Sequence, residues 1–169
     1  MSYELKSISR SGIEEAISKA ELYRYLNEPE ETESICHDIL AIDPVHQIAL
    51  RLLAMAITDQ FEGSSSDRFG EAEGILRRLS DRYEQLYYLG ILHERRAKAL
   101  LRAGRAPHTL LPFFEEAMRC FSEATELRPK GNDDAILRWN RCVRILQCNP
   151  EFAAEKEHVA IEDHDSPPH

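Results

Sequence analysis

Apolar residues recur at helical spacing along most of this chain, most clearly near its C-terminal end. In residues 116–129, small and large side chains alternate on one predicted helical face that a proline ends: Ala117, Phe121, Ala124, Leu127 and Pro129. The small residues let a neighbouring helix approach closely, and the large ones fill the grooves beside it. An upstream segment repeats this spacing with Thr32, Cys36, Ile39, Ile42 and Pro44. A recurring helix that cannot bury its apolar face alone predicts a stack of helical repeats.

The hydrophobic pattern predicts seven helices and lacks the alternation typical of strands, so the expected fold class is all-α. The expected helices span about residues 11–27, 29–42, 44–61, 71–79, 82–103, 113–129 and 133–148. We expect one domain, residues 1–148, with repeats at about 13–46, 47–82 and 83–131 and a cap helix at 132–148. Residues 149–169 are predicted to be an acidic, partly flexible tail, in which a short helix from Pro150 is left open.

Residues with capping propensity predict where several of these helices begin and end. The expected helix starts are a capping box of Ser11 with Glu14, Pro29 at a first helical position, Asp43 ahead of Pro44, and Asp81 with Glu84. Gly104 suits the C-terminal end of the fifth helix. Between the third and fourth helices, the small polar residues of segment 62–70 predict a loop.

The order of these residues resembles the tetratricopeptide repeat (TPR) family. Its helix pairs carry apolar, glycine and tyrosine positions on the first helix and alanine, aromatic and proline positions on the second. The third repeat of this chain shows Leu86, Leu89, Gly90, Ala117, Phe121 and Pro129. The first shows Ala16, Ala20, Tyr23, Thr32, Cys36 and Pro44, and the second shows Leu50, Leu53, Ala54, Ile57, Ala72 and Leu76. The resemblance implies a short right-handed α-solenoid of three irregular repeats, made of antiparallel helix pairs.

Three departures from the family pattern refine this expectation. The stretch from Gly90 to Ala117 exceeds the family spacing by about four helical turns, so we expect a lengthened fifth helix and an extended start of the sixth. Trp139 falls where the family has a small residue, so the seventh helix is interpreted as a C-terminal cap and not as a further repeat. His93 stands at a position where tyrosine is usual, and we expect it to pack between helices.

The resemblance also implies a binding groove, because the first helix of each TPR pair lines the concave face of the stack. The expected groove residues are Ile17, Glu21, Arg24, Ile48, Arg51, Met55, Thr58, Glu84, Tyr87, Ile91 and Arg95. Their apolar members are expected to anchor a partner peptide or helix and not to hold the fold. The alternative left open is that the tail, the cap helix or a second subunit of a homo-oligomer covers them. The corresponding positions hold no cationic clamp of the subtype that binds chaperone C-termini: Ile17, Glu21, Leu52, Glu84 and Tyr88.

Charge is unevenly spread along the 169 residues. Net charge is -9 for the whole chain, -9 for residues 1–76, +5 for 77–148 and -5 for 149–169. The overall sign argues against general nucleic-acid binding. A basic cluster in the middle block offers a surface for an acidic partner, for RNA or for the tail: Arg77, Arg78, Arg82, Arg95, Arg96, Lys98, Arg102 and Arg105. A solvated face with scattered ion pairs is the alternative. For the tail, we expect residues 150–165 to fold back over the fifth or seventh helix.

Chemical motifs are few. The sequence lacks HExxH, GxxxxGK and GxGxxG, so we expect no enzyme and no cofactor. Its four cysteines form no CxxC pair, and its tail histidines specify no metal geometry, so no metal site is expected. Residues 1–12 lack an apolar segment and no apolar run is long enough to span a bilayer, which favours a cytoplasmic protein without a membrane partner.

Together these features predict a non-catalytic protein-interaction module, an adaptor or scaffold that binds a peptide or helix of another protein. The first alternative is a secretion or assembly chaperone that holds a client segment, since some bacterial secretion chaperones are three-repeat TPR proteins of similar size. The second is an RNA-binding accessory protein that uses the basic cluster in residues 77–105. Nucleic acid is the less favoured partner, because no interleaved aromatic residues offer a stacking platform.

Overall fold

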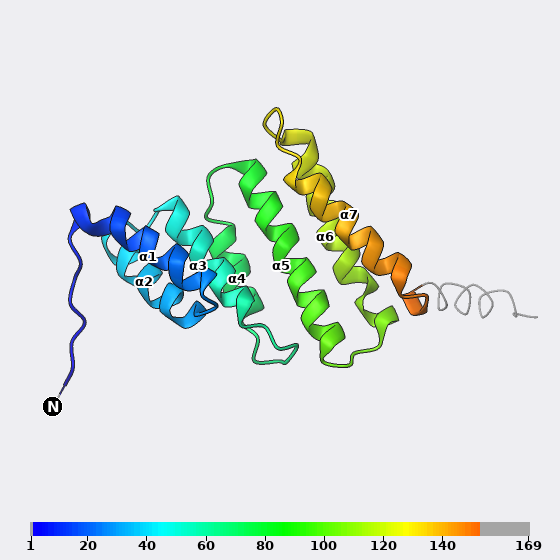
Figure 1. The fold of residues 1–169 in the computed structure, drawn as a ribbon, viewed down its shortest axis with the longest axis horizontal. Helices are drawn as coiled ribbons and strands as arrows, with labels where there is room; N and C mark the ends of the chain where they lie inside the picture. Colours follow the sequence, from blue (N-terminus) through cyan, green and yellow to red (C-terminus); the bar gives the residue numbers. More distant parts are fainter. Residues whose placement is uncertain (1, 153–169) are drawn as a thin grey trace, which may run out of the picture.

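The structure, a computed structural model, describes residues 2–152. These residues form seven α-helices and two short 3-10 helices, with no strand among them. The elements are η1 (Arg10–Gly12), α1 (Ile13–Tyr25), α2 (Pro29–Ile42), α3 (Gln47–Asp59), α4 (Phe69–Leu76), α5 (Arg82–Arg102), η2 (Pro107–Leu110), α6 (Leu111–Leu127) and α7 (Asp134–Cys148). They follow one another along the molecule, from α1 and α2 at one end to α6 and α7 at the other (Figure 1). The all-α prediction is confirmed.

The helices pack in two layers. In one layer α1, α3, α5 and α7 contact one another in that order. In the other layer α2, α4 and α6 each contact the two odd-numbered helices beside them. Consecutive helices therefore pack as a solenoid-like stack of pairs, as the recurring pattern predicts, and α7 closes the described part of the stack (Figure 1).

Several helix ends follow the capping signals. Pro29 occupies the start of α2, where its missing N–H removes no helical hydrogen bond. The Asp81 carboxylate caps α5 by accepting a 2.8 Å hydrogen bond from the Glu84 N–H. Gly104 follows α5 with a φ of +86°, a left-handed conformation that favours glycine. These three predictions are confirmed.

Two other predicted helix starts are wrong. The N-cap of α1 is Gly12, and the Ser11 hydroxyl donates to the Ser9 hydroxyl at 3.3 Å and makes no capping box. The helix α3 begins only at Gln47, after His46, whose Nδ1 accepts from the Ala49 N–H at 3.2 Å. Asp43 instead accepts from the Val45 N–H at 3.3 Å. A side chain that bonds two residues ahead stabilises a turn, so the chain turns before the helix can begin.

The closest contact between helices lies where α5 meets α6. A Cβ atom added to Gly90 would lie only 2.5 Å from a ring carbon of Phe121, so the ring rests directly on the glycine backbone. Ala117 and Phe121 on α6 are both fully buried. Small residues thus bring the two helices together, as the spacing in segment 116–129 predicts.

The long insertion between Gly90 and Ala117 extends regular structure. The helix α5 has 21 residues, and η2 leads into α6, which has 17. The predicted lengthening of the fifth helix and of the start of the sixth is therefore confirmed. These long helices pack against each other at the end of the molecule that also holds α7 (Figure 1).

The polar loop between α3 and α4 is ordered by its own hydrogen bonds. The Asp67 carboxylate accepts from the backbone N–H groups of Glu62, Gly63 and Ser64. A Cβ atom on Gly63, whose φ is +79°, would lie 2.5 Å from the Ala99 carbonyl oxygen. The loop therefore packs closely against α5.

The described chain ends in a packed residue. Phe152 is 5% exposed and meets the Phe114 ring of α6 edge-on, with ring centroids 5.7 Å apart. The rest of the fold-back predicted for residues 150–165 falls on residues 153–165, which lie outside the described part of the chain. Within residues 2–152 no helix is long and apolar enough to cross a membrane. The four cysteines are free, and three are buried: Cys36, Cys120 and Cys142.

Replacing glycine by alanine should have opposite effects on stability at Gly90 and at Gly74. Gly90→Ala should lower the free energy of unfolding by about 1–3 kcal/mol, because the new methyl group overlaps the Phe121 ring. Gly74→Ala in α4 is the matched control: its Cβ would meet no atom within 4 Å, so it should raise stability by about 0.5–1 kcal/mol. Urea unfolding followed by circular dichroism measures both. A stabilised Gly90→Ala protein would contradict the close approach of α5 and α6.

Candidate partner-binding groove

A groove runs across the layer formed by α1, α3, α5 and α7, and it consists of three adjoining hollows. The first encloses about 570 Å³ and is lined by Glu21, Arg24, Tyr25, Asn27, Arg51, Leu52, Asp59 and Tyr88. The second encloses about 300 Å³ and is lined by Thr58, Asp59, Phe61, Arg95, Lys98, Arg102 and Arg138. The third encloses about 360 Å³ and is lined by Lys98, Leu101, Arg102, Arg141, Arg144, Ile145, Cys148 and Asn149. Each hollow shares lining residues with the next, Asp59 between the first and second and Lys98 and Arg102 between the second and third, so the three lie side by side.

The structure divides the predicted groove residues by their chemistry. Five of the six polar members line the hollows, Glu21, Arg24, Arg51, Thr58 and Arg95, and the sixth, Glu84, lines none of them. Ile48 is 38% exposed at the start of α3 and lines none of the three. Tyr87 is half-buried against its aromatic neighbours Tyr83, Tyr88 and Phe121.

Three of the expected apolar anchors are part of the core. Met55 and Ile91 are each 3% exposed and Ile17 is 9% exposed, so none offers a surface to a partner. The prediction that these residues bind a partner without holding the fold is wrong. Its physical cause is the direct packing of α1 on α3 and of α3 on α5, which fills the seams between them with apolar side chains.

A charged network around Asp59 joins three helices at the centre of the groove. Arg24 of α1 donates two hydrogen bonds to the Asp59 carboxylate, at 2.7 and 3.1 Å. Arg95 of α5 lies 2.5 Å from the same carboxylate and donates to the Thr58 hydroxyl at 2.6 Å. Burial lowers the pKa of Arg95, and Asp59 opposes that shift. Asp59 is therefore neutralised from within the chain and holds two arginines in fixed positions.

A second network joins α5 to α7 through a buried acid. Glu94 is completely buried, with Lys98 Nζ 2.5 Å from one carboxylate oxygen and Arg138 Nη1 3.4 Å from the other. On the other side of the groove Arg51 pairs with Glu84 at 3.1 Å and lies over the Tyr88 ring, 5.6 Å from its centroid. The groove acids of α3 and α5 are thus committed to cations of the same chain.

Cations remain in excess where α5 meets α7. Arg102, Arg141 and Arg144 are exposed, and none has an ion-pair partner within residues 2–152. All three line the third hollow. This end of the groove therefore presents guanidinium groups that are free to bind carboxylates in pairs of parallel hydrogen bonds.

The predicted basic cluster does not form one surface. Arg77 pairs with Glu73, Arg78 donates to the Pro44 carbonyl oxygen and Arg82 pairs with Glu123. Arg96 lies over the rings of Phe69 and Phe113, at 4.2 and 5.0 Å, on the side of α5 that faces α4 and α6. Arg105 is exposed beyond the end of α5, so only Arg95, Lys98 and Arg102 line the groove. Successive residues of a helix point about 100° apart, and this disperses the cluster.

Sequence analysis missed the contribution of α7. Arg138, Arg141 and Arg144 recur every three residues, a spacing that places them near one another along a helix. That spacing is visible in the sequence, but this helix was interpreted only as a cap, so its arginines were not assigned to the groove. Asp59 and Glu94 carried no signal of their own, because their roles depend on partners from distant helices.

Comparisons of the chain with protein-family models, with curated proteins and with solved structures gave no match. The TPR resemblance therefore remains an expectation that stands on the residues quoted for it. What the protein does has to be inferred from the chemistry of the groove itself.

The burial of Met55 predicts the effect of placing a charge there. Met55→Asp should lower the free energy of unfolding by about 3–5 kcal/mol, because the carboxylate would be buried without a partner. Ile48→Asp is the control: this half-exposed position lies in the first turn of α3, where a negative charge is tolerated, so the change should stay within about 1 kcal/mol. Thermal unfolding compares the two. If the melting temperature of Met55→Asp equals that of the unchanged protein, Met55 lies in the groove and not in the core.

Proposed function

We propose that this protein is a non-catalytic protein-interaction module, an adaptor or scaffold, which binds an acidic segment of another protein in the groove across α1, α3, α5 and α7. The observation that carries the proposal is the set of exposed arginines at the α5–α7 end, Arg102, Arg141 and Arg144, whose charge no described acid neutralises. A cytoplasmic location belongs to the proposal, and the free cysteines support it.

An acidic partner fits this groove better than an apolar one. Three of the apolar side chains expected to anchor a partner, Ile17, Met55 and Ile91, are buried, and the first two hollows are lined mainly by charged and amide side chains. Complementary charge speeds encounter and selects the partner, while a few arginine–carboxylate contacts hold it in place. The partner is therefore expected to supply glutamate or aspartate side chains at the α5–α7 end.

A polypeptide also fits the groove better than a nucleic acid. The first hollow contains Glu21 and the Asn27 amide beside Arg24 and Arg51, so a partner of uniform negative charge would meet there the Glu21 carboxylate, which is unpaired within residues 2–152. A peptide has backbone N–H groups that can pair with those oxygens. The mixed charge of the lining favours a segment that is acidic at one end only.

A fluorescent ten-residue peptide, oligoglutamate in one half and uncharged serine in the other, tests the proposal by anisotropy at low salt. Replacing both Arg141 and Arg144 by Gln should weaken binding roughly 5- to 30-fold, because two exposed arginine–carboxylate contacts contribute on the order of 1–2 kcal/mol together. The matched control, Arg77→Gln with Arg82→Gln, removes the same charge outside the groove and should change binding less than about twofold.

Equal loss in the two double variants would mean that net charge alone attracts the peptide, and the groove would be refuted. A single-stranded RNA of equal charge serves as the competing probe. If RNA binds more tightly than this peptide and its affinity falls steeply with salt, the protein is a nucleic-acid binder and the proposed partner class is wrong.

A further inference from the structure

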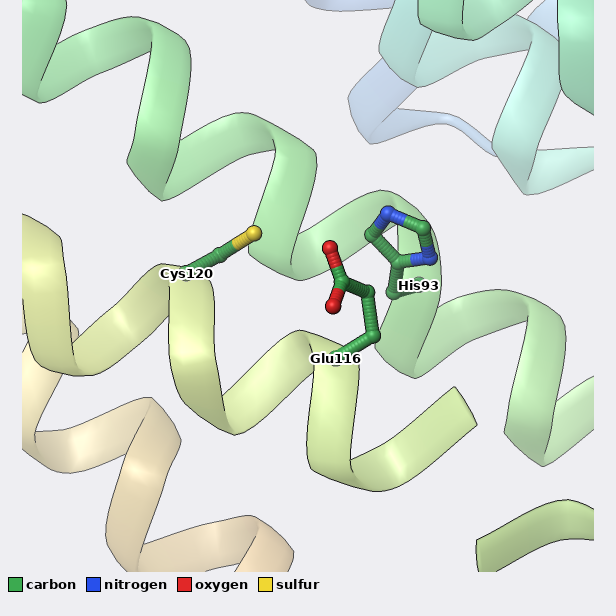
Figure 2. A group of neighbouring side chains, drawn as sticks. All are labelled: His93, Glu116 and Cys120. Carbon is green, nitrogen blue, oxygen red and sulfur yellow. The ribbon is translucent and has the colours of Figure 1, made fainter. Parts of the chain in front are cut away.

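Three side chains that bind transition metals in other proteins converge on the opposite side of α5 from the groove. His93 of α5 faces Glu116 and Cys120 of α6, and one ligand atom from each lies within 4.8 Å of the other two. In Figure 2 the Glu116 carboxylate lies between the Cys120 thiol and the His93 ring. Glu116 and Cys120 are four residues apart on α6, which places both on the face that meets α5.

We propose that His93, Glu116 and Cys120 form a zinc-binding site that links α5 to α6. Nitrogen, oxygen and sulfur donors together favour a borderline-soft divalent ion over magnesium or calcium, which prefer oxygen alone. With bonds of about 2.0–2.3 Å, the ligand atoms of a tetrahedral zinc site lie about 3.4–3.8 Å apart. The cluster needs to close by about 1 Å, which side-chain rotation can supply.

Two of the three ligands already have the protonation state that zinc requires. Burial lowers the pKa of His93, so at neutral pH its ring is uncharged and has a free lone pair. Hydrogen bonds from Arg119 lower the pKa of Glu116, so this carboxylate is ionised. Burial raises the pKa of Cys120 to about 11, and zinc has to displace the thiol proton, as it does when it binds any cysteine.

The residue Arg119 balances the charge of the site. Its guanidinium donates to Glu116 at 3.0 and 2.5 Å, and it also pairs with Glu123. When zinc takes Glu116, Arg119 keeps Glu123 as its partner and is not left as an uncompensated cation. Zinc therefore replaces the Arg119 guanidinium as the cation that pairs with Glu116.

Because the cluster is partly exposed, a metal ion can enter it from solvent and a fourth ligand can bind there. His93 and Glu116 are half-buried, whereas Cys120 is 1% exposed. The Phe69 ring packs against the imidazole in a tilted arrangement, with ring centroids 5.3 Å apart, and restricts its orientation. Three protein ligands with a water in the fourth position complete the tetrahedron. Zinc bound in this way stabilises the folded protein, because the unfolded chain has no such cluster.

Cobalt(II) titration of the full chain, in a reductant without thiols, tests the site. A bound thiolate gives a charge-transfer band, and the visible bands of cobalt report tetrahedral geometry. We expect one cobalt per chain with both signals, displacement by zinc, and a higher melting temperature with zinc. Cys120→Ala should remove the charge-transfer band and weaken binding by about tenfold or more. Cys36→Ala and Cys142→Ala, which remove buried thiols elsewhere, should leave both unchanged.

Two half-buried variants keep the test decisive if Cys120→Ala does not fold. His93→Gln and Glu116→Gln should each weaken cobalt binding by about tenfold or more while the helical circular dichroism stays unchanged. The absence of a thiolate band in the unchanged protein would refute the site. So would a band that survives Cys120→Ala and disappears in Cys148→Ala, because the exposed Cys148 would then bind the metal adventitiously.

Arg119→Gln distinguishes a metal at Glu116 from a metal nearby. Removal of a positive charge beside the site should tighten cobalt binding several-fold, because like charges repel and Glu116 is released from its competitor. Unchanged or weaker binding would show that Glu116 is not a ligand and would overturn the three-residue site.

Discussion

The contact between the Gly90 backbone and the Phe121 ring determines how the second half of the molecule is built. Without a Cβ at position 90, α6 can lie close to α5, and the ring fills the space that a side chain would have taken. His93 lies about one turn beyond Gly90, and Cys120 precedes Phe121 by one residue. The same close approach that buries Phe121 therefore brings the proposed zinc ligands within reach of one another.

The central helix α5 has two chemically different sides. Toward α3 and α7 it presents Glu94 and Arg95, whose partners are charged. Toward α4 and α6 it presents His93, which meets Phe69, Glu116 and Cys120, and Arg96, which lies over aromatic rings. The buried Glu94 adds little net stability, because removing charges from water costs about as much as pairing them returns. Its contact with Arg138 favours one alignment of α7 on α5. That alignment places the unpaired arginines of α7 along the groove.

Sequence reasoning succeeded where local periodicity decides the outcome. The pattern in segment 116–129 correctly predicted a helix whose Ala117, Phe121 and Ala124 are buried, whereas Leu127, expected on the same face, is 52% exposed at the end of α6. It failed at Asp43, where a side chain has two local hydrogen-bonding choices of similar energy. The prediction for Met55 was also wrong. A family pattern indicates which side of a helix lies toward the groove, but it does not indicate how closely the neighbouring helices pack over that side. The His93–Cys120 proximity was invisible, since 26 residues separate them and the pairing depends on the register of two long helices.

The groove and the zinc site can be judged separately because they lie on different sides of α5. His93 and Arg95 are two positions apart, and helical rotation turns their side chains about 200° from one another. Variants of Arg141 and Arg144 leave the zinc ligands untouched, and variants of His93 leave the arginines in place. A defect in both activities from one of these substitutions would therefore indicate that α5 itself has moved. That result would identify the contact of Gly90 with Phe121 as the link between the two sides of the molecule.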